Sequence, residues 1–370
     1  EPARIEVLAP DGTPLFVGAP GGSVAAGAAP HVAFAFRRAE ASYETQFGSF
    51  RIQETAADPW RSARRLVDLV VTADRVTFGL ESEGGEMLGA GEVVAAGEGH
   101  VTITVTAADP AVNRASAAFT CAPEEHFLGL GGQSWDVDHR GQTIPLWVQE
   151  DGISKVDTDS FEDDDLWFLV GRRHSTHTPM PIFLSSRPYA LLLDTPGRSI
   201  FALCSEAEDV ARVEAWEGAL RLHVLHGSTP AATVERLTGH LGRPAVPPAF
   251  AFAPWLDALY GSDNVRRVAA KLRAEDIPAS VIWTEDWRGG ADDGMGYTLD
   301  EDWELDRALY PDFEALSTDL HALGYKFLTY NNTFLTNISE AYFQEESVHL
   351  ASSCFPVVPV QKQSDFFYTW

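Results

Sequence analysis

The 370-residue sequence is poor in basic residues and in cysteine. Its 27 lysines and arginines face 54 acidic residues, which gives a net charge of −27. With no positive surplus to offset phosphate repulsion, this balance argues against sequence-independent nucleic-acid binding. The three cysteines, Cys121, Cys204 and Cys354, are too few and too scattered for a disulfide framework or a zinc site. We therefore expect them to be small buried hydrophobic side chains.

Long apolar runs are also missing. No stretch approaches the roughly 20 apolar residues that span a bilayer, so we expect no membrane span. No basic-then-apolar leader is present, and the chain begins at Glu1 rather than Met, which suggests a processed or trimmed start. That start and the high acidity favour an exported protein, extracellular or periplasmic. A composition of 45% hydrophobic and 22% charged residues is typical of a globular protein with an ample core.

Up to about residue 245, apolar and polar residues alternate with a period of two. Clear examples are Val76, Phe78 and Leu80; Val101, Ile103 and Val105; and Leu220, Leu222 and Val224. Short alternating segments separated by Gly, Pro and Asp predict a β-sandwich with one solvated face per sheet. We therefore expect residues 1–245 to form an N-terminal β-sandwich domain.

The pattern changes after the proline-rich stretch "GRPAVPPAF" (242–250), which predicts a stiff linker. Apolar strands then alternate with helical stretches: "FAFAPWLD" and "ASVIWTED" predict strands, and residues 262–275 predict a helix capped by Ser262 or Asp263. Another helix is expected after Pro311, ending at Gly324, before the strand "YKFLTYNN". This βαβαβ series predicts that residues 246–370 form the first strands and helices of a (β/α)₈ TIM barrel, apparently incomplete.

Polar and aromatic residues follow each predicted strand of this second domain. They are Asp257 after Trp255, then Glu285-Asp286-Trp287 in "SVIWTEDWRGG", and then Asn331-Asn332. Active sites of such barrels lie at the carboxyl ends of the strands. Aromatic faces pack on pyranose rings and carboxylates accept hydrogen bonds from sugar hydroxyls, so the pattern indicates a carbohydrate subsite. An ordinary strand end with surface acids is the competing interpretation.

Two further groups of residues resemble metal-binding motifs, but we do not expect either to bind a metal ion. The acidic run from Glu162 to Asp165 lacks the spaced oxygens and glycine turn of a calcium loop, so we interpret it as a solvated surface loop. His174 and His177 have ligand-like spacing but no neighbouring carboxylate or thiolate in the sequence, so we expect surface positions. No metal site is predicted.

Four segments, in order and with matching spacing, resemble glycoside hydrolase family 31, the retaining α-glycosidases that include α-glucosidases, α-xylosidases and sulfoquinovosidases. They are "EEHFLGLGGQSWDVDHRGQTIPLW" (124–147), "PMPIFLSSRPYALLLDTP" (179–196), "LTGHLGRPAVPPAFAFAPWL" (237–256) and "VRRVAAKLRAEDIPASVIWTEDW" (265–287). The resemblance covers the N-terminal portion of the family. It implies a galactose-mutarotase-like β-sandwich followed by the barrel, and double displacement by two carboxyl groups about 5 Å apart. No cofactor is implied, since carboxylates suffice.

The resemblance also implies substrate contacts. Asp286 matches a carboxylate that binds sugar hydroxyls, Trp287 its aromatic neighbour, and Asp138 a sandwich-loop acid that reaches toward the site. We expect Arg140 to be structural, pairing with loop carboxylates. Trp255 is either a pocket residue or barrel core.

Substrate choice is expected to depend on Tyr260, which lies where the family varies. Sulfoquinovosidases place a polar amide there and follow the DW motif with basic and Trp residues. Here "RGGADDGMGYTLDEDW" (288–303) is rich in acids, which disfavours a sulfonate, although Arg288 leaves the question open. We expect a neutral α-linked sugar such as a glucoside or xyloside.

The family's nucleophile motif is not found in the sequence. Asp365, in "QSDFFYTW", echoes it without its leading Trp and trailing Glu, so we expect the nucleophile and acid/base beyond Trp370. The alternative is a catalytically inactive carbohydrate-binding or assembly protein. An incomplete barrel would leave apolar edges uncovered, which a homo-oligomer or a second chain could cover.

Overall fold

The computed structural model describes residues 4–21, 28–46, 49–152, 154–160, 167–292, 296–300, 304–331, 334–336 and 367–369. The chain divides into two compact units, Glu1–Arg243 and Pro244–Trp370. The division falls within the proline-rich stretch, close to the boundary expected at residues 245–246. No helix among the described residues has the length and apolar character needed to cross a membrane.

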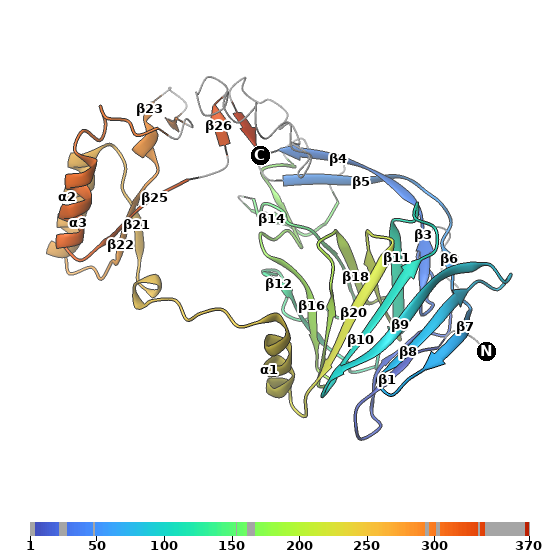
Figure 1. Cartoon of the computed structure of the whole chain (residues 1–370). Coiled ribbons are helices and arrows are strands. Elements are labelled where there is room, and N and C mark those ends of the chain that lie inside the picture. The colour runs from blue at the N-terminus through green and yellow to red at the C-terminus, as the bar shows by residue number, and fades with distance from the viewer. Residues whose placement is uncertain are drawn as a thin grey trace. The chain divides into compact units, whose positions relative to one another are not determined.

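An eight-stranded antiparallel sheet forms one layer of the N-terminal unit (Figure 1). In sheet order its strands are β12 (Phe127–Gly131), β16 (Pro179–Ser185), β17 (Tyr189–Leu193), β20 (Ala219–His226), β10 (His100–Ala107), β9 (Met87–Gly97), β8 (Arg75–Glu81) and β7 (Arg65–Val71). The period-two segments predicted around residues 78, 103 and 222 are confirmed as β8, β10 and β20.

A six-stranded sheet forms the second layer. Its order is β13 (Gln142–Leu146), β18 (Ser199–Ala207), β19 (Val210–Ala215), β11 (Arg114–Thr120), β3 (Ala35–Arg37) and β6 (Arg61–Ser62). The two layers enclose one hydrophobic core. Phe183 of β16, for example, packs against Phe119 of β11 and Phe201 of β18, with ring centroids 6.3 Å apart in both pairs. Every second side chain therefore faces the other sheet, which is the physical origin of the alternation.

Three smaller strand pairs complete the β-structure of this unit: β1 (Glu6–Leu8) with β2 (Pro14–Val17), β4 (Ala39–Gln46) with β5 (Ser49–Ala57), and β14 (Lys155–Val156) with β15 (Gly171–Arg172).

A helix that the sequence analysis did not predict ends the unit. Helix α1 (Pro230–Leu241) packs Leu237 against Ala190 of β17 and Leu225 of β20. Its start has the usual signals, since the Thr229 side chain accepts a hydrogen bond from the Ala232 N–H and Pro230 occupies the first turn.

The C-terminal unit contains a three-stranded parallel sheet in the order β21 (Trp255–Asp257), β22 (Val281–Thr284) and β25 (Lys326–Thr329). Helices α2 (Ser262–Ala274) and α3 (Phe313–Ala322) connect these strands and pack on the sheet through Val265, Ala269, Leu316 and Leu320. The predicted βαβαβ order is confirmed. The remaining elements are η1 (Ala249–Phe252), η2 (Asp286–Arg288), β23 (Gly290–Asp292), β24 (Tyr297–Leu299), β26 (Phe334–Thr336) and β27 (Phe367–Thr369).

Two local predictions for this unit were wrong. The segment "FAFAPWLD" is not one strand, because Ala249–Phe252 forms a 3₁₀ turn and only Trp255–Asp257 pairs with β22. Helix α2 is capped by Gly261 rather than by Ser262 or Asp263. Gly261 has a φ of 84°, and a Cβ there would lie 2.7 Å from the Leu309 carbonyl oxygen, so both conformation and space favour glycine.

Candidate functional site

The carboxyl ends of the three parallel strands meet at one edge of the sheet. Asp257 is paired with Trp283 in the register of β21 and β22, and Thr284 with Thr329 in that of β22 and β25. The residues that follow these positions therefore lie along the same edge, which we call the carboxyl edge. This juxtaposition is what parallel strands produce and what the sequence analysis expected.

Asp286 lies just beyond β22 and is completely buried. Its Oδ2 accepts hydrogen bonds from the Tyr260 N–H and the Tyr297 hydroxyl, both at 2.7 Å. Its Oδ1 accepts one from the Thr284 hydroxyl, at 2.7 Å, and one from the Tyr310 hydroxyl. Both carboxylate oxygens are thus engaged by the protein itself. A direct contact of Asp286 with a sugar stays a prediction.

The donors around Asp286 come from separate segments of the carboxyl edge. Tyr260 belongs to the connection between β21 and α2, Tyr297 to β24, and Tyr310 to the segment before α3. Burial and the hydrogen bond to Asp286 raise the pKa of Tyr297 and of Tyr310 well above the ordinary value. Both phenols therefore stay protonated and donate. One carboxylate consequently joins three segments.

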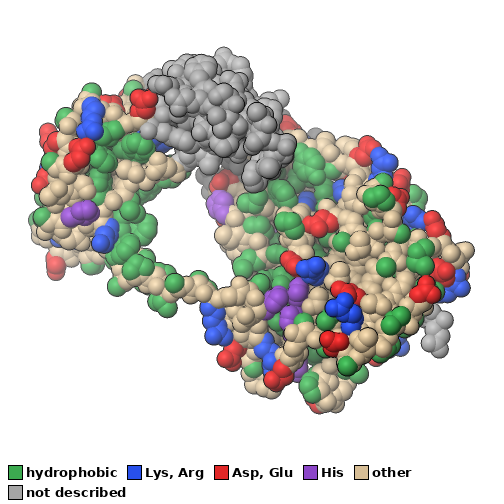
Figure 2. Space-filling view, viewed as in Figure 1, with side chains coloured by type: hydrophobic (Ala, Val, Ile, Leu, Met, Phe, Trp, Pro, Cys, Tyr) green, Lys and Arg blue, Asp and Glu red, His purple; other side chains and the backbone are tan. Residues whose placement is uncertain are grey.

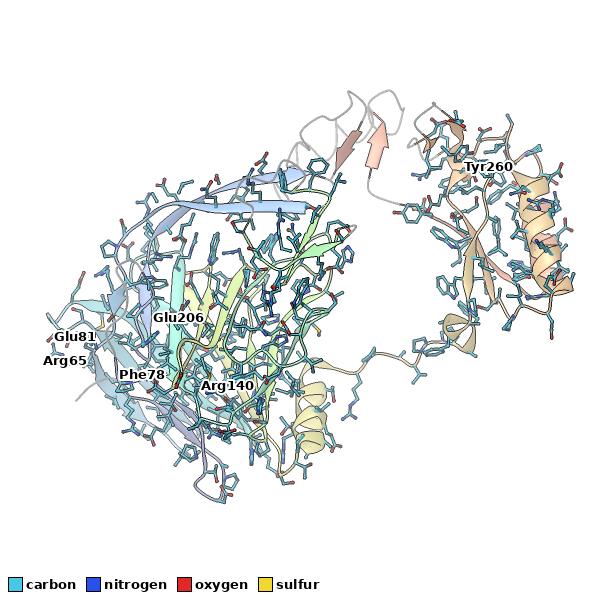
Figure 3. All side chains as sticks on the ribbon, turned by 180° about the vertical axis from the view of Figure 1, so that it is seen from behind. Arg65, Phe78, Glu81, Arg140, Glu206 and Tyr260 are labelled. Atoms are coloured by element: carbon cyan, nitrogen blue, oxygen red, sulfur yellow. A yellow bond between two sulfur atoms is a disulfide. The ribbon has the colours of Figure 1, made fainter. Side chains whose placement is uncertain are left out.

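Tyr260 is the most exposed member of this group. Its side chain is 59% exposed, while its backbone has a φ of 67°, in the left-handed region (Figure 3). That conformation is unfavourable for a bulky residue, and the Tyr260 N–H bond to Asp286 helps to hold it. The Tyr260 and Tyr297 rings lie 4.6 Å apart between centroids. The arrangement presents an aromatic face at the carboxyl edge.

Asp257 is the acid with the most perturbed titration at this edge. Partial removal from water, together with repulsion from the Glu285 and Asp286 carboxylates, raises its pKa to about 6. Acids that titrate near neutrality are concentrated at functional sites, where burial and like charges often occur together. From the sequence, Asp257 was predicted to follow a strand, but no individual substrate contact was assigned to it.

Trp287 is half-buried, and its Nε1–H donates to the Tyr330 carbonyl oxygen at 2.8 Å. The Tyr330 ring packs on Trp283, with centroids 5.6 Å apart. This hydrogen bond and this ring contact thus link the end of β22 to the end of β25. Strand β22 ends at Thr284, and Asp286 begins the 3₁₀ turn that follows it.

Trp255 does not lie where a pocket residue would. It is the first residue of β21 and pairs with Val281, the first residue of β22, so it stands at the amino edge of the sheet. Its ring stacks on Phe250 and its Nε1–H donates to the Phe250 carbonyl oxygen. This placement argues against the predicted sugar contact for Trp255.

At the end of β25, Asn331 is exposed and its Nδ2 donates to the Thr329 carbonyl oxygen at 3.3 Å, so it caps the strand end. Asn332, Asp365 and the acidic run from Glu162 to Asp165 lie outside the described residues.

In the N-terminal unit, Asp138 is a turn residue. Its Oδ1 accepts from the N–H groups of Phe127 and Arg140, and its Oδ2 lies 2.6 Å from the His126 Nδ1. Burial acts to raise the pKa of Asp138, but hydrogen bonds from the Arg140 N–H and His126 outweigh it and lower the pKa. A sugar contact for Asp138 stays a prediction, and its described partners belong to its own loop.

Arg140 is structural, but not through the carboxylates that the sequence analysis expected. Its guanidinium donates to the carbonyl oxygens of Ala122, Glu125 and Glu208, at 2.8–3.0 Å (Figure 3). It also lies 3.1 Å from the Cys121 sulfur. Backbone oxygens take the place of the expected acids because Arg140 bridges two loops rather than facing one.

The expectation for the cysteines was wrong for two of them. Cys121 and Cys204 form a disulfide across 83 residues of sequence. The sequence spacing gives no sign of this pair, because β11 and β18 are brought close only by the six-stranded sheet, where they flank β19 on its two sides.

His174 is another correction. It is buried rather than exposed, with its Nδ1 2.6 Å from Asp159 and its Nε2 2.9 Å from Gln142. His177 is exposed, as expected, and pairs with Glu150 at 2.8 Å. Both histidines have carboxylate neighbours that are distant in sequence, 15 residues away for His174 and 27 for His177.

Sequence reasoning missed the two phenols that hold Asp286. No motif spacing links residue 286 to Tyr297 and Tyr310, which lie 11 and 24 positions away. The available signal was chemical. A carboxylate directly after a buried strand needs hydrogen-bond donors, and tyrosine combines a hydroxyl donor with an apolar ring that packs well in a buried site.

Comparison with known proteins confirms the resemblance to glycoside hydrolase family 31 over part of the chain. Residues 244–355 match the family model described as the glycosyl hydrolases family 31 TIM-barrel domain. A sulfoquinovosidase of Agrobacterium fabrum is 30% identical over 235 residues, which are 63% of this chain and 35% of that protein. An α-xylosidase of Lactiplantibacillus pentosus is 23% identical over 257 residues, 68% of this chain and 30% of that protein. The chain spans about a third of the length of the curated relatives that it matches.

The fold is shared with solved structures of the same family. A family 31 sulfoquinovosidase from E. rectale, in complex with an aza-sugar inhibitor, superimposes with a TM-score of 0.76 at 21% identity, covering 94% of this chain and 50% of that one. An α-xylosidase from a soil metagenome, complexed with xylose, gives a TM-score of 0.59 at 14% identity, covering 82% of this chain and 53% of that one.

Proposed function

We propose that this chain is the sugar-recognising portion of an α-glycoside hydrolase. The observation that carries the proposal is the carboxyl edge of β21, β22 and β25. There Asp257, Tyr260, Asp286 and Trp287 come together in a unit that matches the family's barrel domain. We further propose that these elements are the first part of a (β/α)₈ barrel and that the N-terminal unit is the family's β-sandwich.

The roles of the four residues follow from their surroundings. The exposed Tyr260 ring and the half-buried Trp287 offer apolar faces for the C–H side of a pyranose. Asp257 accepts hydrogen bonds from hydroxyls, and its pKa of about 6 lets it do so as the carboxylate at neutral pH. Asp286 acts mainly through Tyr260 and Tyr297, whose positions it fixes.

We assign neither member of the reacting carboxyl pair to the described residues. Retention requires two carboxyl groups about 5 Å apart, one as nucleophile and one as acid/base. Asp286 is unsuited to attack, since both of its oxygens already accept hydrogen bonds from groups of the protein. Hydrolysis is thus proposed for the whole protein and recognition for this chain.

For the substrate we propose a neutral α-linked sugar, a glucoside or xyloside. Support comes from the acids at the edge, since Glu285 and Asp286 already raise the pKa of Asp257 and would repel a sulfonate in the same way. A sulfonated sugar is the second candidate. It is favoured by the relatives named sulfoquinovosidase and by the buried Arg288 at the same edge.

The test is binding rather than turnover. We would titrate the 370-residue chain with methyl α-glucoside, methyl α-xyloside and sulfoquinovose by calorimetry. Tyr260→Ala should weaken binding of the preferred sugar about tenfold through loss of one aromatic face. Tyr43→Ala removes a similarly exposed ring from β4 and should change nothing. Equal effects of the two variants, or no binding of any sugar, would contradict the proposal. Preference for sulfoquinovose would replace the neutral substrate by the second candidate.

Turnover assays then separate an enzyme from its alternative. Hydrolysis of an α-glycoside by the protein that contains this chain would support the enzyme. Binding without hydrolysis would favour a catalytically inactive carbohydrate-binding protein. For localisation we propose an extracellular or periplasmic site of action, supported by the Cys121–Cys204 disulfide, because such bonds persist in oxidising compartments.

A further inference from the structure

Three histidines from three different elements meet on the N-terminal unit. His100 begins β10, His223 lies in β20, and His240 lies in the last turn of α1. One ring nitrogen from each lies within 4.8 Å of those of the other two. Figure 2 shows histidine side chains, in purple, gathered on the surface of this unit.

The sheet register explains how two of them come together. Thr102 pairs directly with His223, and His100 stands two residues before Thr102 on the same face of β10. Their neighbours Val101 and Leu222 pack into the core between the sheets, so the histidines point to the opposite, outer face. The His100 Nε2 and the His223 Nδ1 are 2.9 Å apart.

Helix α1 brings the third. Leu237 packs on the outer face of the sheet, and His240 follows three residues later on the same side of the helix. The His240 ring lies 4.8 Å from the His100 ring and 4.5 Å from the His223 ring, between centroids. The three rings thus form a compact group, which we call the histidine cluster.

We propose that the histidine cluster binds a transition-metal ion with the preferences of Zn²⁺. Three imidazoles and one open position are a common zinc arrangement, with Zn–N distances of about 2.0–2.1 Å. A tetrahedral ion then needs nitrogen atoms about 3.3 Å apart, which small ring rotations provide from the observed separations. Imidazole ligands select such ions over Mg²⁺ and Ca²⁺, which prefer oxygen.

The surroundings of His223 fit a ligand. With Nδ1 directed at His100, its Nε2 lies 3.8 Å from the Asp194 carboxylate. A metal-binding histidine commonly directs its second nitrogen to a carboxylate, which fixes the ring and raises its basicity.

The bound ion would fasten α1 to the sheet. Two ligands belong to neighbouring strands and the third to the helix, so metal binding is coupled to docking of the last turn of α1. This role is independent of sugar recognition in the other unit, and the experiment therefore uses no sugar.

The experiment is a calorimetric titration of the chelator-stripped chain with Zn²⁺ at pH 7.5. One equivalent should bind per chain, with no competition from excess Mg²⁺ or Ca²⁺. His240→Ala and His223→Ala should each weaken binding by at least tenfold, and Asp194→Asn by about tenfold. Co²⁺ in place of Zn²⁺ should give the intense visible absorption of a tetrahedral site, and His240→Ala should remove it.

The matched control is His177→Ala. His177 is exposed and lies beside Glu150 and Asp151, so it is the natural competitor for a surface metal. This variant should bind Zn²⁺ as tightly as the parent chain. Absence of saturable binding, unchanged affinity in His240→Ala, or loss of affinity in His177→Ala would overturn the proposal. Because His240 is exposed, its variant decides the question even if His223→Ala fails to fold.

Discussion

Asp286 shows how a single residue can organise the carboxyl edge. A buried carboxylate is costly unless donors replace its lost water. Here one backbone N–H, two phenols and one hydroxyl do so. Because the donors come from different loops, the need of one carboxylate for hydrogen bonds fixes the positions of Tyr260 and Tyr297.

Asp286→Asn should therefore destabilise the C-terminal unit. The amide keeps one acceptor oxygen in place of two, and at least one buried donor loses its partner, which costs roughly 1–3 kcal/mol. Urea unfolding followed by tryptophan fluorescence measures the change. Asp263→Asn, an exposed acid in the first turn of α2, is the control and should cost only a few tenths of a kcal/mol. Equal midpoints for the two variants would contradict the assigned role.

Asp257, unlike Asp286, lowers the stability of the folded chain when it is ionised, so its effect on stability depends on pH. Its folded pKa of about 6 exceeds the ordinary 3.8, so the folded chain holds this proton more tightly than the unfolded chain. Protonation therefore stabilises the fold below pH 3.8, and this contribution is lost as the pH rises through about 6.

Asp257→Asn, which is neutral at all pH values, should raise the melting temperature above pH 6 and leave it unchanged near pH 3.5. After solvent screening the gain is on the order of 1 kcal/mol. Thermal unfolding across this pH range provides the measurement, with Asp263→Asn as the reference. A gain at pH 3.5 as large as that at pH 7.5 would rule out titration as the cause. The same variant should bind sugar more weakly, because it loses the carboxylate proposed to accept hydrogen bonds from sugar hydroxyls. Asp257 would then lower stability while it supports function.

At the scale of elements, the sequence predicted best where packing on one face leaves a periodic pattern. Leu316 and Leu320 of α3 are completely buried, and Gly324 after the helix has a φ of 82°. The leucines that give the helical spacing in the sequence are therefore the ones that pack against the core, and the glycine that marks the expected end lies just after the helix. Strands β8, β10 and β20 were predictable for the corresponding reason, since alternate residues face the shared core.

The prediction failed where contacts are distant in sequence. His100 and His223 are 123 residues apart, and Cys121 and Cys204 are 83 apart. Sequence rules for metal sites and disulfides depend on residues that lie close together in the sequence. Neither the histidine pair nor the cysteine pair could therefore be recognised from spacing. Asp286 was identified from its motif, but its enclosure by Tyr297 and Tyr310 depends on loops whose course no periodicity encodes.

Helix α1 was not predicted although its start has strong signals, because it follows the alternating strand β20 closely and buries only Thr233 and Leu237. Thr229→Ala should test these signals. The loss of the cap on the Ala232 N–H should cost about 1 kcal/mol, measured by urea unfolding of the N-terminal unit. Thr229→Ser retains the hydroxyl and should stay close to the parent. Similar losses in both variants would mean that the methyl group of Thr229, rather than its cap, supports the helix.

At the scale of the whole molecule, the Cys121–Cys204 disulfide and Arg140 join the same two segments. The disulfide connects the ends of β11 and β18, while the Arg140 guanidinium bridges Ala122 and Glu125 on one side to Glu208 on the other. The covalent and hydrogen-bonded links therefore hold one corner of the N-terminal unit. A chain with a net charge of −27 repels itself, which increases the value of such links in keeping the unit compact.

Removal of the disulfide should accordingly lower the stability of this unit by about 2–4 kcal/mol, chiefly because the unfolded chain regains the freedom of a long loop. We would compare Cys121→Ala/Cys204→Ala with the parent by urea unfolding, with and without dithiothreitol. Reductant should shift the parent to the midpoint of the double variant and leave that variant unchanged. In Cys354→Ala, thiol titration after unfolding should count no thiols before reduction and two after it. Two thiols without reductant would show that the pair is not joined, and the support that it gives to an exported location would be lost with it.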